Sequence, residues 1–174
     1  MIPLLLFLVT LAIGVVSDVR ARRVPNLLVV TMLGLAGAGA VWSWSPAGSV
    51  GHAVGGMAGG LGLWLPFWLL GLLGAGDVKF FAAGSAWIGW PLAWRAAVIT
   101  AVLGGLMGIL VLVNRGGVRR TMAGVLLQYQ QATRIIASAD ASAADAKART
   151  FPYAVPMALA LASAAINPPL LLRW

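Results

Sequence analysis

Two aspartates stand out among the few acidic residues of this chain. Only four of its 174 residues are Asp or Glu, and two of these, Asp18 and Asp77, lie at the ends of long apolar segments. An ionisable side chain at or near membrane depth is unfavourable unless it has a partner, so such a residue indicates a functional site. Two carboxylates that can meet predict acid/base chemistry. Asp140 and Asp145 lie instead in a polar stretch, where solvated charge is ordinary.

Asp18 lies where the first apolar segment ends. The residues that follow include three arginines, among them Arg23, and then Pro25 and Asn26. Pro25 suits the start of a new helix because the amide hydrogen that proline lacks has no partner at that position. A structural alternative remains open for Asp18, in which it pairs with one of the arginines and holds a loop.

Asp77 follows two glycines in the segment Gly74-Ala75-Gly76-Asp77-Val78-Lys79. Glycine permits close approach of the backbone or a positive φ, so the carboxylate can enter a crowded site. If a helix begins near Val78, Asp77 also lies at a helix N-terminus, where the dipole favours an anion. The structural alternative is a helix cap that pairs with Lys79.

No other residues in the sequence form an equally good hydrolytic set. The chain contains one histidine, His52, and no cysteine. Disulfides, thiolate metal sites and a cysteine nucleophile are therefore excluded, and a serine triad or a zinc site is disfavoured. We expect no metal and no cofactor, and we expect His52 to be structural and to lie at the opposite end of its segment from the aspartates.

The composition of the chain predicts the elements that must position the two aspartates. The chain is 61% hydrophobic and 9% charged, with a mean hydropathy of +0.95. Soluble domains contain about 25% charged residues, so we expect an all-α integral membrane protein with the lipid bilayer as its surroundings. The formal charge is +8, but the basic residues lie between apolar runs and form no stripe with aromatic residues. A nucleic-acid partner is therefore not expected.

Six segments are long and apolar enough to cross a bilayer, for which about 20 residues are needed. In the first of them the positive charges follow the apolar run, the reverse of a cleavable signal peptide, so we expect a permanent span. The fourth is the weakest, because three tryptophans near Pro91 indicate either an aromatic belt at a hairpin turn or a re-entrant segment. The expected spans are residues 2–17, 26–45, 50–73, 78–94, 95–114 and 151–172.

The distribution of basic residues predicts the orientation. With the N-terminus outside, the stretches 18–25, 74–79 and 115–150 are cytoplasmic, which places both aspartates on the cytoplasmic side. Only Arg95 and Arg173 then lie outside. The ten basic residues inside are Arg20, Arg22, Arg23, Lys79, Arg115, Arg119, Arg120, Arg134, Lys147 and Arg149.

Two further sequence features bear on the organisation of the bundle. Residues 119–137 could form an amphipathic surface helix within the cytoplasmic stretch, with a solvated loop as the alternative. Glycines are concentrated in the second and third spans, and we interpret them as sites of close helix packing in preference to a dimer face. The glycines of the third span, including Gly55, Gly59 and Gly60, could also leave room for a substrate helix or for motion. We expect one membrane domain over residues 1–174.

These segments together resemble the paired signature of the type IV prepilin peptidases, membrane aspartyl proteases with a Gly-x-Gly-Asp motif. The resemblance includes Asp18 with Arg23-Val24-Pro25-Asn26, then Gly74-Ala75-Gly76-Asp77-Val78-Lys79, in matching order and spacing. The segment Phe151-Pro152-Tyr153-Ala154-Val155-Pro156 is similar to the element that begins the final catalytic helix of the family. The resemblance implies that Asp18 and Asp77 are catalytic and that Gly74, Gly76, Lys79, Arg23, Pro25 and Asn26 shape the site.

The resemblance also implies a substrate and a location. The substrate would be a prepilin with a basic leader and an apolar helix, cut at the cytoplasmic face of the inner membrane, with pilus assembly machinery as a possible further partner. Full-length members of the family carry an N-terminal cytoplasmic region with a cysteine cluster, which is associated with methylation. This chain starts directly at the first expected span and contains no cysteine, so it resembles the compact Flp-pilus and archaeal preflagellin peptidases. We therefore expect no methyltransferase activity. The oligomeric state is not indicated.

Two functions from other classes remain as alternatives. A proton- or cation-coupled transporter could use intramembrane carboxylates, although such a pathway would place acids near mid-membrane and on both sides of it. A noncatalytic pilus assembly subunit could retain the peptidase bundle. Either aspartate could act as the base, because a coupled carboxylate pair titrates as a unit.

Overall fold

The fold is all-helical throughout the part of the chain that the computed structural model describes. The described residues are 2–21, 24–42, 45, 47–70, 73–114 and 153–166, with the side chains of 110–114 excepted. They form six helices and no strand, in agreement with the expected class. The helices are α1 (Ile2–Ala21), α2 (Asn26–Val41), α3 (Val50–Leu69), α4 (Ala75–Ile88), α5 (Trp90–Asn114) and α7 (Ala154–Ile166).

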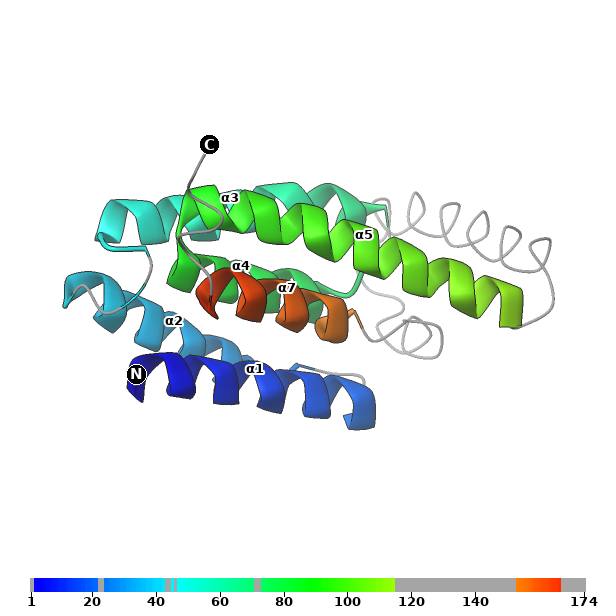
Figure 1. The fold of residues 1–174 in the computed structure, drawn as a ribbon, viewed down its shortest axis with the longest axis horizontal. Coiled ribbons are helices and arrows are strands. Elements are labelled where there is room, and N and C mark those ends of the chain that lie inside the picture. The colour runs from blue at the N-terminus through cyan, green and yellow to red at the C-terminus, as the bar shows by residue number, and fades with distance from the viewer. Residues whose placement is uncertain are drawn as a thin grey trace, which may run out of the picture.

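Successive helices alternate in direction, so the bundle has two distinct ends (Figure 1). One end holds the C-terminus of α1 and the N-termini of α2, α4 and α7, and we call it the carboxylate end because Asp18 and Asp77 lie there. The other holds the C-termini of α2 and α4 and the N-termini of α3 and α5, and we call it the tryptophan end. Figure 1 also shows that α5 extends beyond the other helices at the carboxylate end.

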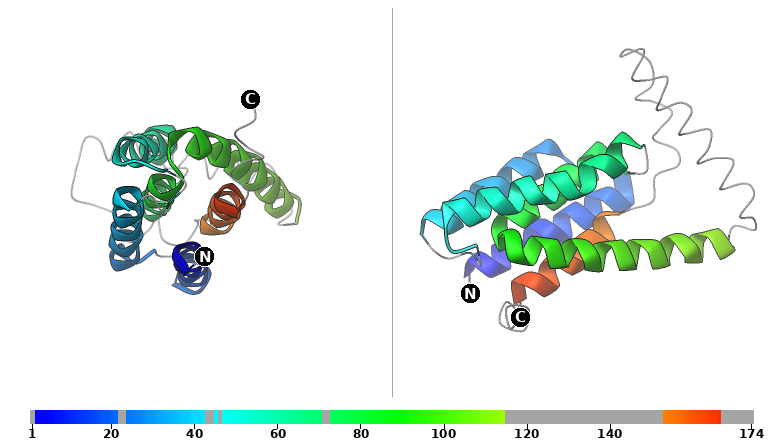
Figure 2. Two further views of the ribbon diagram at one scale, coloured as in Figure 1. Left: turned by 60° about the vertical axis from the view of Figure 1, so that its left-hand side comes forward. Right: turned by 90° about the horizontal axis from the view of Figure 1, so that it is seen from above.

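Helix α4 is the central helix of the bundle. Every residue from Phe80 to Gly89 is buried, and α4 packs against α2, α3, α5 and α7. Figure 2 shows it among these helices. A helix that is apolar on all sides is buried in this way, so α4 positions Asp77, in its first turn, inside the bundle.

The outer surface of the bundle is strongly apolar. Helix α1 exposes Ile2, Leu5, Val9 and Ile13, and the other helices expose similar side chains. By length and composition, Ile2–Ala21 and Trp90–Ile109 are able to cross a membrane. An apolar surface of this extent favours contact with lipid or with another protein. The expected count of six spans and their orientation stay predictions.

The helix boundaries differ from the expected spans at two positions that matter. Helix α1 continues to Ala21, so Asp18 lies inside its last turns and not after its end. The expected boundary between residues 94 and 95 is wrong, because α4 ends at Ile88, α5 begins at Trp90, and Trp94 lies within α5. Gly89 has φ +80°, which glycine adopts readily, and Pro91 falls in the first turn of α5, where proline is tolerated.

Glycines of α3 pack against α4 and α5. A Cβ at Gly56 would overlap the Ser85 carbonyl oxygen, and one at Gly59 would overlap the Trp90 ring. A Cβ at Gly60 would meet the Ser85 side chain. These three glycines therefore serve close packing, as expected, and the space beside them is filled by the bundle itself. Residues 115–150, including the expected amphipathic helix, lie outside the described residues.

Candidate active site

Helices α1 and α4 bring Asp18 and Asp77 together through an antiparallel register. Phe7 of α1 stacks on Trp87 of α4, with ring centroids 5.0 Å apart. Further along both helices, a Cβ at Gly14 would overlap the Phe80 ring, so this side chain of α4 lies directly against α1 there. About one more turn in the same register leads to Asp18 on α1 and Asp77 on α4.

Asp18 is buried on the inner face of α1. It shares this face with Phe7, Leu11 and Gly14, at the spacing that places residues on one side of a helix. The side chain is 6% exposed, and its Oδ2 accepts a hydrogen bond of 3.3 Å from the Ala154 amide. The Tyr153 carbonyl accepts the first helical bond of α7, from Met157 at 3.2 Å. Asp18 therefore satisfies one of the amides that a helix N-terminus leaves without an intrahelical partner.

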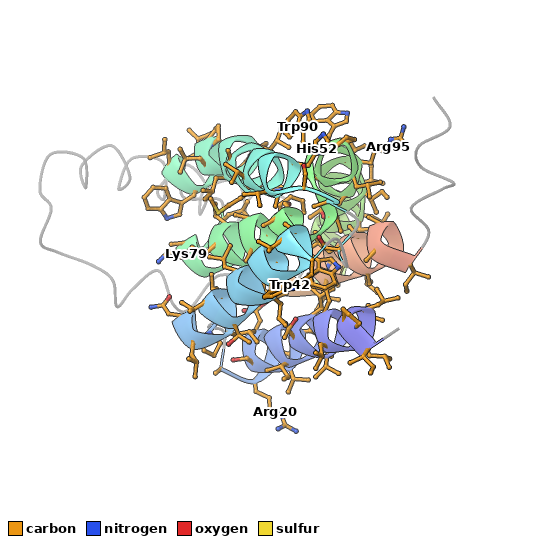
Figure 3. The ribbon with its side chains drawn as sticks, turned by 90° about the vertical axis from the view of Figure 1, so that its left-hand side faces the viewer. Arg20, Trp42, His52, Lys79, Trp90 and Arg95 are labelled. Atoms are coloured by element: carbon orange, nitrogen blue, oxygen red, sulfur yellow. The ribbon has the colours of Figure 1, made fainter. Side chains whose placement is uncertain are left out.

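Asp77 lies in the first turn of α4 and is also 6% exposed. Its Oδ2 accepts a hydrogen bond of 3.3 Å from the Gly74 amide, so Asp77 does cap its own helix. Lys79 is exposed and points away from the bundle in Figure 3. Because residues two apart on a helix do not face each other, the alternative in which Asp77 pairs with Lys79 is not supported.

The two carboxylates interact electrostatically. Asp77 lies before the segment expected to span the membrane, and its pKa is raised above the ordinary aspartate value. Burial is the larger cause, because it disfavours the charged form, and the charge of Asp18 is the second. The hydrogen bond from Gly74 acts in the opposite direction. The pair is thus arranged to hold a proton at a pH where isolated aspartates have lost theirs.

Of the two motif glycines, Gly74 makes room for Asp77, whereas a Cβ at Gly76 would be in ordinary contact with the segment after α1. A Cβ at Gly74 would lie 3.1 Å from Asp77 Oδ2, and one at Gly76 would lie 3.6 Å from Val24 Cβ. The positive-φ glycines in the described residues are Gly48 and Gly89. Close approach, and not a positive φ, is therefore the reason that the structure gives for glycine at position 74.

Apart from the motif glycines, the other predicted site residues that the structure describes are exposed. Pro25 precedes α2 as expected, and both it and Asn26 are exposed at the carboxylate end. Arg23 lies outside the described residues. Among the described residues, no group of three His, Cys, Asp or Glu side chains is suited to hold a metal ion. His52 is exposed at the tryptophan end, opposite the aspartates, as expected, and its Nδ1 lies 3.2 Å from Ser49 Oγ.

Tyr153 is a residue of this site that was not among the predicted site residues. It immediately precedes α7, and its hydroxyl is within electrostatic range of the Asp77 carboxylate. The signal in the sequence is the aromatic and proline segment 151–156, which by itself gives Tyr153 no role. Residues 151 and 152 lie outside the described residues.

Comparisons with known proteins identify the family of this chain. The model of the type IV leader peptidase family matches residues 5–109, which include both aspartates. A prepilin leader peptidase/N-methyltransferase of Burkholderia pseudomallei (strain 1026b) is 38% identical over 101 residues, covering 53% of this chain and 31% of the relative. One with the same name from Aeromonas hydrophila is 41% identical over 68 residues, covering 35% of this chain and 23% of the relative.

These matches cover less than a third of each curated relative. No solved structure matches the chain. The family match, in contrast, extends over more than half of the chain and includes both segments from which the buried carboxylates come. The chain therefore belongs to the type IV leader peptidase family.

Proposed function

We propose that this protein is a membrane aspartyl endopeptidase that removes the leader peptide of a type IV prepilin. The observation that carries the proposal is that two buried carboxylates, Asp18 and Asp77, lie at one end of the bundle within electrostatic range of each other. The names of the relatives, which include prepilin leader peptidase, agree with it. We further propose that the substrate is of the Flp type and that cleavage occurs at the cytoplasmic face of the inner membrane.

The reaction proposed is hydrolysis of one peptide bond by the carboxylate pair. One carboxylate takes a proton from water, whose oxygen attacks the scissile carbonyl carbon, while the protonated partner donates to the carbonyl oxygen. Return of a proton to the leaving nitrogen then breaks the C–N bond. A raised pKa for Asp77 supports the presence of the shared proton that this sequence needs.

The apolar surface of the bundle suits a substrate with an apolar helix. Such a helix can lie in the bilayer beside the protein and present its polar junction at the level of Asp18 and Asp77. The cytoplasmic orientation is supported by the basic residues of the sequence. Of those described, Arg20 and Lys79 lie at the carboxylate end and Arg95 lies near the start of α5, at the tryptophan end.

The deciding experiment is cleavage of a purified Flp-type prepilin by the purified protein in detergent. Native protein is compared with Asp18→Asn and Asp77→Asn, which remove a charge with little change in shape. Asp140→Asn and Asp145→Asn are matched controls that remove the same charge elsewhere in the sequence. We expect both site variants to lose cleavage and both controls to retain it.

Two outcomes of this experiment would contradict the proposal. Full activity in both site variants would reject a carboxylate mechanism. Failure of the native protein to cut any of several type IV prepilins would favour a noncatalytic assembly subunit. A proton- or cation-coupled transporter is less well supported, because both buried carboxylates lie at one end of the bundle.

A further inference from the structure

The start of α7 contacts Asp18 and lies within electrostatic range of Asp77 through adjacent residues. The Ala154 amide donates to Asp18 Oδ2 at 3.3 Å, and the Tyr153 hydroxyl interacts electrostatically with Asp77. Asp18 and Ala154 are 136 positions apart in the chain. A displacement of this one helix start would therefore change the surroundings of both carboxylates at once.

The ring of Tyr153 packs against α5 at a glycine. A Cβ built on Gly104 would lie 3.0 Å from Cε1 and 3.5 Å from Cδ1 of Tyr153. The first of these atoms is on the side of the ring next to the carbon that bears the hydroxyl. Gly104 is buried, whereas its neighbour Gly105 and the nearby Gly108 are exposed, with open space at their Cβ positions. The absence of a side chain at position 104 is thus what allows the ring to lie there.

The rest of α7 is held close to α4. A Cβ at Gly84 would overlap the side chain of Leu161, and Leu161 and Met157 are both fully buried. Close packing of this kind resists sliding of one helix past another. The position of the helix start relative to Asp77 is therefore set by α4 on one side and by Gly104 of α5 on the other.

We propose that Tyr153, seated against Gly104, is a positioning residue that sets the geometry and the proton affinity of the Asp18 and Asp77 pair. Its backbone begins the helix whose first amide binds Asp18, and its hydroxyl is within electrostatic range of Asp77. This inference rests on the proposed peptidase function. It assigns a role to a residue that lies outside the stretch matched by the family model.

The first test compares two glycines that are adjacent on α5. In Gly104→Ala the new methyl group moves the Tyr153 ring by a few tenths of an ångström, and we expect kcat for prepilin cleavage to fall roughly 3- to 10-fold, because small displacements of reacting groups have large effects on rate. KM should be unchanged. The matched control Gly105→Ala makes the same chemical change in open space and should retain the native kcat.

The second test removes only the hydroxyl. In Tyr153→Phe the environment of Asp77 becomes less polar, so its neutral form is further favoured and the alkaline limb of the kcat profile moves to higher pH. A shift of roughly 0.5 to 1 pH unit corresponds to the loss of one polar partner. Thermal unfolding in detergent is measured for each variant to check that it folds. Tyr153→Phe retains the aromatic ring, so it still tests the inference if Gly104→Ala does not fold.

A double variant separates positioning from a general effect on folding. When Tyr153→Ala has removed the ring, adding Gly104→Ala should lower kcat no further. The inference is overturned if Asp18→Asn and Asp77→Asn are inactive while Tyr153→Phe has the native pH profile and Gly104→Ala equals Gly105→Ala. Cleavage by the two Asp variants would instead overturn the proposed function itself.

Discussion

The polar groups at the two ends of the bundle differ in how far they are buried. At the carboxylate end, Asp18 and Asp77 are each 6% exposed, and each accepts a backbone amide hydrogen bond. At the tryptophan end, His52 is exposed and lies beside Ser49, which caps α3. Trp42, Trp90 and Trp94 are exposed there as well, as Figure 3 shows for Trp42 and Trp90.

This difference separates groups arranged for chemistry from groups arranged for folding and anchoring. A buried carboxylate that is partly kept from ionising makes the fold less stable than a neutral group would, so its presence favours a functional role. Exposed tryptophans at one level suit the interface between a bilayer and water. The four predictions below test the contrast between the ends.

The largest effect is expected from one polar substitution made at each end in turn. We expect Asp77→Asn to lower the kcat of prepilin cleavage by roughly 10²- to 10⁴-fold, the usual contribution of a positioned acid or base. His52→Gln, a polar substitution at the opposite end, should leave kcat unchanged. A comparable loss from both variants would show that cleavage does not depend on the carboxylate end alone.

The next effect concerns packing between α3 and α4. In Gly56→Ala the new Cβ overlaps the Ser85 carbonyl oxygen, and because backbone cannot move aside easily, we expect the free energy of unfolding to fall by about 1 to 3 kcal/mol. Gly62→Ala is the control, since nothing lies within 4 Å of its Cβ position. Thermal unfolding in detergent measures both, and equal stability would contradict the close approach of the two helices.

Removing the charge of Asp77 should also stabilise the fold at neutral pH. Because its pKa is raised in the folded state, the folded protein binds this proton more tightly than the unfolded chain. The free energy of unfolding therefore falls as the pH rises from about 4 through the raised pKa. Asp77→Asn carries no charge and its amide oxygen can still accept from Gly74.

We expect the melting temperature of Asp77→Asn to exceed that of native protein at pH 7, and the difference to vanish near pH 4. Each unit of pKa shift corresponds to about 1.4 kcal/mol, or roughly 3 to 5 °C for a chain of this size. Melting curves across this pH range measure the difference. A variant no more stable than native protein at pH 7 would show that burial does not disfavour the charged form of Asp77.

The smallest effect is expected at the cap of α3. Ser49 Oγ accepts a hydrogen bond of 3.3 Å from the His52 amide, so Ser49→Ala should destabilise the protein by about 1 kcal/mol. Ser49→Thr retains the cap and serves as the control. Neither variant should change the pH dependence of cleavage, and a change in that profile would couple the tryptophan end to the carboxylates.

The sequence was informative about the carboxylate end because its signals are local. Rare acids beside apolar runs, glycines directly before Asp77, and Pro25 before a helix are each visible within a few residues. The all-helical class follows from the length of the apolar runs. The expected boundary near residue 94 was wrong because a run of apolar residues and tryptophans conceals where it is divided. Pro91 indicated a turn nearby, and the structure places that turn at Gly89, which has a positive φ.

Contacts between distant segments were decided only by the tertiary structure. The sequence by itself determined that Asp18 and Asp77 are unusual, because the unfavourable burial of a charge depends on composition and local position. It did not determine that the Ala154 amide binds Asp18 or that Gly104 makes room for Tyr153. Both contacts depend on how helices separated by long stretches of chain pack together, and that register is set by side-chain shapes along the whole interface.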